Sequence, residues 1–168
     1  MNIEIYPLDK IVIDGAEICL GMERSAVESA IGKGQMVGTR YYYFDQEMAI
    51  DYSSNKVAFI EFLSGVDGRL KPTIYGVSAF ETKADELCNI LKKQNNGAIN
   101  DTERGYSYQF QNISVGVFRE AVPEEVQEMI EEAASFGNPM SEDEIQYEMK
   151  RAHYWASIGI GTAGYYQR

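Results

Sequence analysis

Residues 40–62 read RYYYFDQEMAIDYSSNKVAFIEF, and they set the architecture that we expect for the chain. Three apolar and aromatic runs in this stretch are separated only by the short polar connections 45–46 and 53–55. Strands joined by connections this short run antiparallel, because a parallel crossover needs about a dozen residues or more. The sequence therefore predicts a three-stranded antiparallel sheet, with strands at 40–44, 48–52 and 56–63.

A helix is expected before these strands, and the same order then begins again. Four apolar residues of 20–32 fall on one helical stripe, and Gly32 is placed to end that helix in a left-handed conformation. A second helix is expected to start at Thr82, which can cap it, and strands follow at 106–110 and 113–119. The apolar face of the second helix consists of Ala84, Leu87, Cys88 and Leu91.

The two halves of the chain are similar in pattern. The aromatic segments 41–46 and 106–111 occupy the same place in each half, at a spacing of about 60 residues. This similarity indicates an internal duplication of a helix followed by three strands. We therefore expect one domain, 1–168, made of two sub-repeats, 1–66 and 74–168.

The second half differs from the first by a helical insert, 120–152, before its third strand. Pro123 suits a first helical position, and Ser141 begins a capping-box sequence for a second helix. In 153–166 glycines alternate with apolar residues, so one face of the third strand is bare backbone, and we expect something either to pack closely on it or to bend it. The expected fold class is α+β: an antiparallel sheet with helices on one face, two unequal helix-β-β-β repeats, and an acidic two-helix insert in the second.

Negative charge is concentrated in this insert. The chain has 168 residues, with 26 Asp and Glu against 15 Lys and Arg, and a formal net charge of −11. Ten of the acidic residues and no Lys or Arg lie within 120–149, which leaves 16 acidic and 15 basic residues elsewhere. Nucleic acid and anionic membranes would repel such a chain, so we expect neither as a partner. A basic protein is compatible with this charge.

Cysteine usage and the lack of targeting segments favour a cytoplasmic protein. Residues 1–7 lack the basic stretch and apolar core of a signal peptide, and no run approaches the roughly 18 apolar residues of a membrane helix. Cys19 and Cys88 lie too far apart for a C-x-x-C metal or redox motif. We expect both to be small buried residues in a reducing compartment.

Residues 15–22, GAEICLGM, followed by Val27, Ile31 and Gly32, resemble the helix-entry motif of the β-lactamase inhibitory protein repeat. The small lipoprotein of the outer-membrane barrel-assembly machine also resembles this repeat. The resemblance implies a short helical unit on one face of an antiparallel sheet whose other face is free. In the inhibitor, two tandem repeats form one saddle-shaped sheet, and its aromatic-rich concave face grips an enzyme. For an acidic cytoplasmic relative, the resemblance implies a bacterial immunity protein that neutralises a toxin.

The sequence offers few components for catalysis. His153 is the only histidine, so a Ser-His-Asp, Cys-His or multi-histidine metal site is hard to assemble. Adjacent carboxylates such as Glu131 and Glu132 diverge by about 100° around a helix and do not converge on one ion. We therefore expect no catalytic residue, no cofactor and no metal. The alternative of a small-ligand or enzymatic pocket near His153 remains open.

The aromatic residues point to protein binding. Twelve Tyr and seven Phe concentrate on the expected strands, and tyrosine anchors many interfaces because it offers a large contact area with little rotamer entropy. Alternation places Tyr41 and Tyr43 on the opposite face of their strand from Tyr42 and Phe44, but it does not fix which face is covered. Each ring is thus either an anchor or part of the core. The residues expected as anchors are Tyr41, Tyr43, Tyr106, Tyr108 and Trp155.

The acidic insert supplies a second expected binding surface. Its carboxylates either solvate the helices or steer a basic partner, which raises encounter rates by up to ~10–10³-fold at low salt. The residues expected here are Glu124, Glu128, Glu131 and Glu132. We expect a non-enzymatic protein-binding module, a monomer or weak homodimer, that acts as an inhibitor or immunity protein against a basic toxin or enzyme. A self-associating structural protein is a third interpretation.

Overall fold

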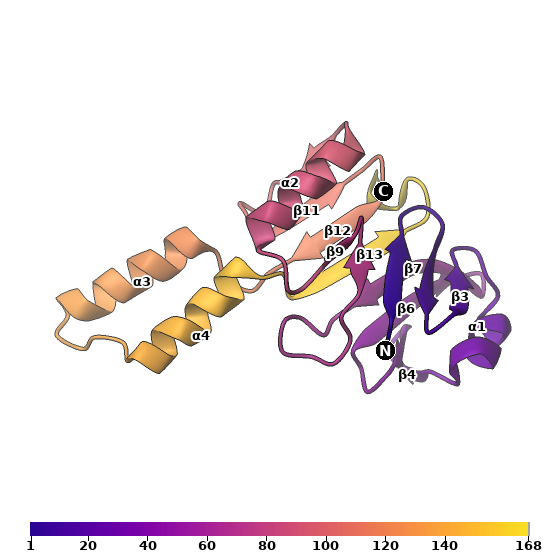
Figure 1. The fold of residues 1–168 in the computed structure, drawn as a ribbon, viewed down its shortest axis with the longest axis horizontal. Helices are drawn as coiled ribbons and strands as arrows, with labels where there is room; N and C mark the ends of the chain where they lie inside the picture. Colours follow the sequence, from indigo (N-terminus) through magenta and orange to yellow (C-terminus); the bar gives the residue numbers. More distant parts are fainter. Residues whose placement is uncertain (168) are drawn as a thin grey trace.

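The computed structural model describes residues 1–167 and contains two β-sheets, one of eight strands and one of five (Figure 1). Four α-helices and a short 3-10 helix, η1 (Tyr165–Gln167), complete the described chain. All strand pairs are antiparallel except one in the smaller sheet. The expected α+β class with antiparallel sheets is confirmed. Within residues 1–167, no helix combines the length and the apolar character needed to cross a membrane.

The larger sheet combines strands from both halves of the chain. The first half contributes β4 (Gln35–Val37), β5 (Arg40–Tyr43), β6 (Met48–Ser53) and β7 (Lys56–Phe62). The second half contributes β10 (Ile99–Asn100), β11 (Ser107–Phe110), β12 (Val115–Phe118) and β13 (Ser157–Gly161). The strand order is β10-β11-β12-β13-β7-β6-β5-β4, so β7 and β13 pair at the centre. Each half has one strand more than the sequence predicts, because β4 and β10 are too short to show alternation.

In each half, one helix precedes the strands of the larger sheet. The first, α1 (Arg24–Ile31), ends as expected at Gly32, whose φ is 92°. The second, α2 (Ala84–Asn95), begins after Lys83, and no side chain caps it. The expected cap at Thr82 is therefore wrong, because Lys83 occupies the N-cap position. The predicted apolar face of α2 is buried.

The smaller sheet is absent from the sequence prediction. Its strands are β1 (Ile3–Tyr6), β2 (Lys10–Ile13), β3 (Ala16–Cys19), β8 (Thr73–Ile74) and β9 (Val77–Ser78), in the order β3-β2-β1-β8-β9. The N-terminal segment is extended, and β1 pairs with β8 in parallel, which joins residues far apart in the chain. Two-residue strands give no periodic signal, so the sequence pattern could not indicate this sheet.

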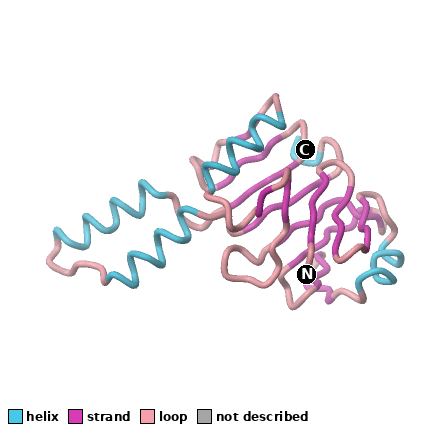
Figure 2. The backbone as a smooth tube through the Cα atoms, viewed as in Figure 1, coloured by secondary structure: helices cyan, strands magenta, loops and turns pink. Residues whose placement is uncertain are grey.

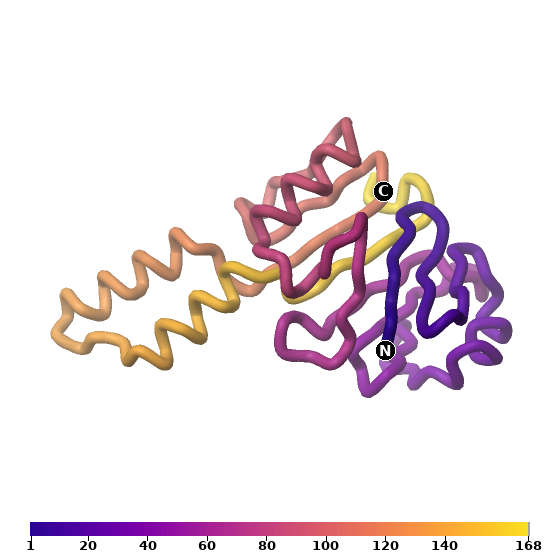
Figure 3. Tube along the Cα trace, in the orientation of Figure 1, coloured from indigo at the N-terminus to yellow at the C-terminus, as the bar shows by residue number. Residues whose placement is uncertain are grey.

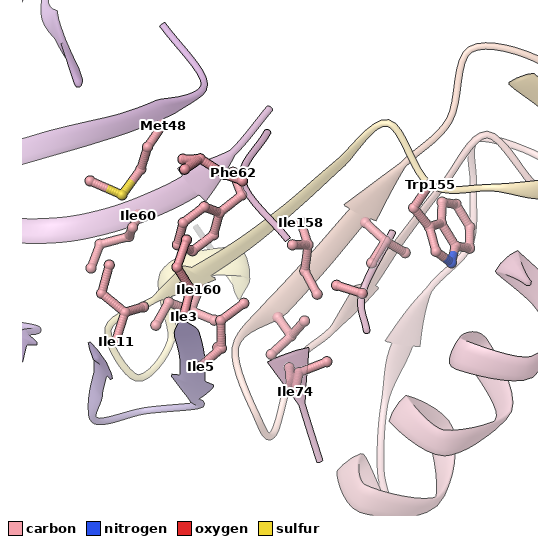
Figure 4. Close-up of a cluster of buried hydrophobic side chains, with 14 of the residues drawn as sticks. Ile3, Ile5, Ile11, Met48, Ile60, Phe62, Ile74, Trp155, Ile158 and Ile160 are labelled. Atoms are coloured by element: carbon pink, nitrogen blue, oxygen red, sulfur yellow. The ribbon is translucent and has the colours of Figure 1, made fainter. Parts of the chain in front are cut away.

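The hydrophobic core lies between the two sheets (Figure 4). Alternation along β13 points Ile158 and Ile160 into this core, opposite the face of Gly159. Burial of an isoleucine or phenylalanine side chain stabilises the fold by roughly 1.5–3 kcal/mol. The smaller sheet supplies Ile3, Ile5, Ile11 and Ile74, and the larger sheet supplies Met48, Ile60, Phe62, Ile158 and Ile160.

Trp155 belongs to this core. Its side chain is 1% exposed, and its indole N–H donates to the carbonyl oxygen of Ala84 at 3.0 Å. The guanidinium of Arg119 lies 5.0 Å from the centre of the ring, and the Tyr108 ring meets it edge to face at 5.9 Å. The expectation of an exposed anchor at Trp155 is therefore wrong, because the residue joins α2 to the end of the insert.

The insert forms an arm that projects away from both sheets (Figures 2 and 3). It consists of α3 (Pro123–Ser135) and α4 (Glu142–His153). Pro123 begins α3, and Ser141 with Glu144 forms the predicted capping box of α4. Val126 and Ala152 form a small apolar cluster with Ala121 at the base of the arm. The chain leaves β12 and returns to β13 at the same point, where the backbone N–H of Ala156 donates to the carbonyl oxygen of Phe118 at 2.7 Å.

Replacement of Trp155 by phenylalanine tests its place in the core. Trp155→Phe should lower the free energy of unfolding by about 1–3 kcal/mol, because the buried carbonyl oxygen of Ala84 loses its donor. Tyr154→Phe, at a half-buried neighbouring position, should change it by less than about 0.5 kcal/mol. Denaturant unfolding followed by far-ultraviolet circular dichroism measures both. Equal effects of the two substitutions would contradict this placement.

Candidate functional site

The face of the larger sheet that points away from the core carries the candidate site. Cross-strand pairing aligns one row of residues on this face, from β11 to β7: Gln109, Gly116, Gly159 and Glu61. Two of the four residues are glycines, so the middle of the row is backbone without side chains. The row therefore forms a low floor between β11 and β7.

Three aromatic rings lie over this glycine floor. A Cβ atom placed on Gly159 would overlap the ring of Phe59, and one placed on Gly116 would overlap the ring of Tyr166. The rings of Phe59 and Tyr165 stack with centroids 4.6 Å apart and planes at 3°. The close packing that the sequence predicts on the bare face of this strand is confirmed, and the C-terminal η1 supplies two of the rings.

A groove of about 410 Å³ opens beside these rings. Phe118, the last residue of β12, lines it and is 42% exposed. Glu61 and Glu103 also line it, and none of the described lining residues is Lys, Arg or His. Its polar lining further includes Ser107, Gln109 and Ser157. The groove is thus aromatic, polar and negatively charged.

Glu61 takes part in a charge cluster with one cation. Arg40 contacts Glu61 through Nη2 and Asp51 through Nε, both at 2.8 Å. Burial by itself would lower the pKa of Arg40, but its pairing with Glu61 and Asp51 raises it above its ordinary value. Arg40 therefore stays charged and offsets one of the two carboxylates. A net negative charge remains beside the floor of the groove.

The hydroxyl of Tyr166 is a hydrogen-bonding group available at the groove. Burial, followed by the charge of Glu61, raises the pKa of Tyr166 far above its ordinary value, so the hydroxyl keeps its proton. It forms no hydrogen bond with another residue of 1–167, although the ring contacts Phe59 and Tyr165. A molecule in the groove can accept a hydrogen bond from this hydroxyl.

The arm presents a second exposed surface. The four glutamates expected to bind a partner, Glu124, Glu128, Glu131 and Glu132, are all exposed on α3. Phe136 lies directly after α3, at the far end of the arm, and is 79% exposed. An exposed ring among carboxylates on a projecting arm is accessible to a protein partner.

Two arginines, one buried and one partly exposed, make contacts at the base of the arm. Arg119 is 5% exposed and donates to the carbonyl oxygens of Gly105 and Ala152, each at 2.8 Å. The second of these oxygens belongs to the last turn of α4, where a cation is favourable. Arg151 in turn pairs with Glu120 at 2.9 Å. Contacts from both ends of the insert therefore hold it to the sheet.

The predicted tyrosine anchors lie mostly on the covered face of the sheet. Tyr43 is 4% exposed, so it belongs to the core and the expectation of an exposed anchor is wrong. Tyr41 and Tyr108 are half-buried and pack against the same core, and Tyr108 is also among the residues that line the groove. Tyr106 is half-buried, and its hydroxyl donates to Glu125 of α3, so it connects the sheet to the arm.

Sequence reasoning missed the residues that line the open face. Val115 and Val117 fall on one side of the predicted strand, so Gly116 and Phe118 necessarily face the other side. The same argument places Gly159 on the face of its strand opposite Ile158 and Ile160. In the structure it pairs with Gly116. The signal was thus the alternation of glycine with branched residues, rather than the number of tyrosines.

A second pocket, of about 170 Å³, lies at the base of the arm. Its cations are paired, because Lys150 contacts Asp67 at 2.5 Å and Arg151 contacts Glu120. His153 lines none of the three pockets described for this structure. In the part of the chain that the structure describes, no three His, Cys, Asp or Glu side chains are grouped to hold a metal ion.

No family model, no curated protein and no solved structure matches the chain. The class of protein therefore has to follow from the geometry of the fold and the site. The fold and site together describe an α+β protein with an uncovered, aromatic and acidic sheet face and a projecting acidic arm.

The glycine floor can be tested by adding one methyl group. Gly159→Ala should lower the free energy of unfolding by about 1–3 kcal/mol, because its Cβ overlaps the buried Phe59 ring. In a chain that already carries Phe59→Ala, the same substitution should cost much less, since the overlapping ring is gone. Thermal and denaturant unfolding of the four proteins in this cycle measures the coupling. A cost independent of Phe59 would contradict the arrangement.

Arg119 can be tested as the residue that fixes the arm. Arg119→Met should lower the free energy of unfolding by about 2–4 kcal/mol, because the carbonyl oxygens of Gly105 and Ala152 lose a charged donor. The last turn of α4 should also exchange its amide hydrogens faster. Arg151→Met, a partly exposed arginine on the same arm, is the matched comparison and should cost less. Unchanged protection of α4 in Arg119→Met would overturn this role.

Proposed function

We propose that the chain is a non-enzymatic protein-binding module, an inhibitor or immunity protein that blocks a basic protein partner. The open face of the larger sheet and the acidic surface of the arm would form its two contact regions. The observation that carries the proposal is the groove on the open face, where aromatic rings surround a glycine floor beside Glu61.

The sheet supports the proposal through its exposed chemistry. Phe118, an aromatic side chain with 42% exposure, lies next to carboxylates in a groove where no described lining residue is basic. Aromatic residues dominate the energetics of many protein interfaces, and exposed apolar patches with polar rims mark binding sites. The open face therefore has the composition of an interface.

The arm supports the proposal through its charge. Residues 120–149 carry ten acidic and no basic residues. Exposed carboxylates of one sign attract a basic protein over distances near the Debye length and raise its association rate. The partner would thus meet the arm first and then the sheet.

The arrangement of elements supports the proposed relationship to the β-lactamase inhibitory protein repeat. In each half one helix, α1 or α2, precedes the strands that enter the larger sheet, and the two halves join in that sheet through β7 and β13. Two tandem units in one sheet with an aromatic free face are what that resemblance implies. We also propose a cytoplasmic location, supported by the unpaired thiols of Cys19 and Cys88.

Affinity capture tests this function directly. Tagged protein is incubated with lysate of its source at low and at high salt, and the retained proteins are identified by mass spectrometry. We expect one stoichiometric basic protein that high salt releases. Retention of further copies of the chain alone, with a mass that depends on concentration, would favour the self-associating interpretation.

Charge reversal on α3 tests the role of the arm with the purified partner. Glu128, Glu131 and Glu132 replaced by Lys should lower the association rate by about tenfold or more at low salt, with a weaker salt dependence. The control replaces Glu4, Asp9 and Glu81, which are exposed elsewhere, and changes the net charge equally. Stopped-flow or surface-binding kinetics measures both triple variants. Equal rates for the two variants would contradict steering by the arm.

A further inference from the structure

The charged residues among those described as lining the groove on the open face are both acidic. Glu61 and Glu103 line it, without a basic side chain among the described lining residues. Glu103 is exposed and forms no ion pair within 1–167, whereas Glu61 shares Arg40 with Asp51. A single guanidinium thus offsets one of three carboxylates. The groove retains a negative field that favours a cationic occupant.

Aromatic side chains form part of the groove's lining. Phe59 is 7% exposed and stacks on Tyr165, whereas Tyr165 and Tyr166 are half-buried. The exposed Phe118 ring adds a further surface. Ring faces attract cations, and a guanidinium also stacks flat on them.

The floor of the groove offers no free main chain to an occupant. β7, β12 and β13 are interior strands, paired on both sides. A peptide therefore cannot join this face as an additional strand, which requires an open sheet edge. The polar groups that remain are side chains, chiefly the two carboxylates and the Tyr166 hydroxyl. An occupant of the groove is thus recognised through one of its side chains and not through its main chain.

We infer that the groove receives an arginine side chain carried on an extended segment of a protein partner. The inference rests on the proposed function and names the chemistry that the partner must present. Arginine matches the site because its guanidinium can contact Glu61 or Glu103 at two points and stack on a ring at the same time. The volume of about 410 Å³ also leaves room for residues that flank the arginine.

A peptide titration tests the inference without the partner. The probes are blocked seven-residue Gly/Ser peptides with one central arginine, lysine or citrulline, the last being neutral and nearly the same shape as arginine. Titration is followed by amide chemical shifts of isotope-labelled protein. We expect the arginine peptide to bind about fivefold or more tightly than the citrulline peptide, with lysine between them. The largest shifts should fall on Gly116, Gly159 and Phe118.

Two substitutions identify the carboxylates that act. Glu103→Gln removes an exposed charge without disturbing the core, and Glu61→Gln removes the charge next to Arg40. Each should reduce the preference for arginine over citrulline, whereas Glu4→Gln, an equal charge change on the smaller sheet, should preserve it. Equal affinity for arginine and citrulline peptides, or shifts confined to the arm, would overturn the inference.

Failure of the inference can be told apart from failure of the proposed function. If Glu103→Gln and Phe118→Ala leave the affinity for a captured partner unchanged while charge reversal on α3 lowers it, the groove is not the arginine site but the binding module stands. If the wild-type chain captures no partner, the proposed function fails, whatever the peptides do. If the arginine peptide binds and both groove variants also weaken the partner, the inference is supported.

Discussion

The antiparallel pairing of β7 with β13 is the interaction on which the rest of the structure depends. It joins the two halves at the centre of one sheet, with Ile60 opposite Ile160. Without it, each half would present a long unpaired edge, which is a site of aggregation. β13 follows the insert in the chain, so this pairing also requires residues 119–156 to leave the sheet and return at one point. Because β12 and β13 are neighbours in the sheet, the insert between them cannot lie within the sheet and projects as the arm.

The same central strand determines the two faces of the sheet. Ile158 and Ile160 point into the core, while Gly159 and Gly161 leave the other face low enough for rings to approach the backbone. A larger residue at these positions would have filled the floor with its own side chain. One face of this five-residue strand thus stabilises the core, and its other face forms part of the candidate binding surface. The aromatic groove exists because one face of β13 is made of glycine.

Elements with their own local signals were predictable from the sequence, and those fixed by distant contacts were not. The capping box at Ser141, the stop at Gly32 and the hairpins of 40–62 rest on neighbouring residues, and each is present. The smaller sheet depends on the pairing of β1 with β8, which joins Glu4 to Thr73, and on the two-residue strands β8 and β9. Because that sheet decides which face is covered, the sequence could not show whether Tyr41 and Tyr43 face solvent. Alternation correctly placed Tyr41 and Tyr43 on one face, which is the covered one, but Phe44 lies after β5 and also packs against the core.

The arm and the sheet differ in charge, so we expect them to act at different stages of complex formation. The arm holds the uncompensated carboxylates, and long-range attraction from them acts before contact and mainly raises the association rate. The groove has few charges but offers rings and a shaped floor, which act only at contact distance and mainly slow dissociation. Arg119 connects the two, since its guanidinium bonds to the last turn of α4 while stacking on Trp155. This buried arginine holds the base of the arm to the sheet. A partner that first meets the arm is therefore close to the groove in which it docks.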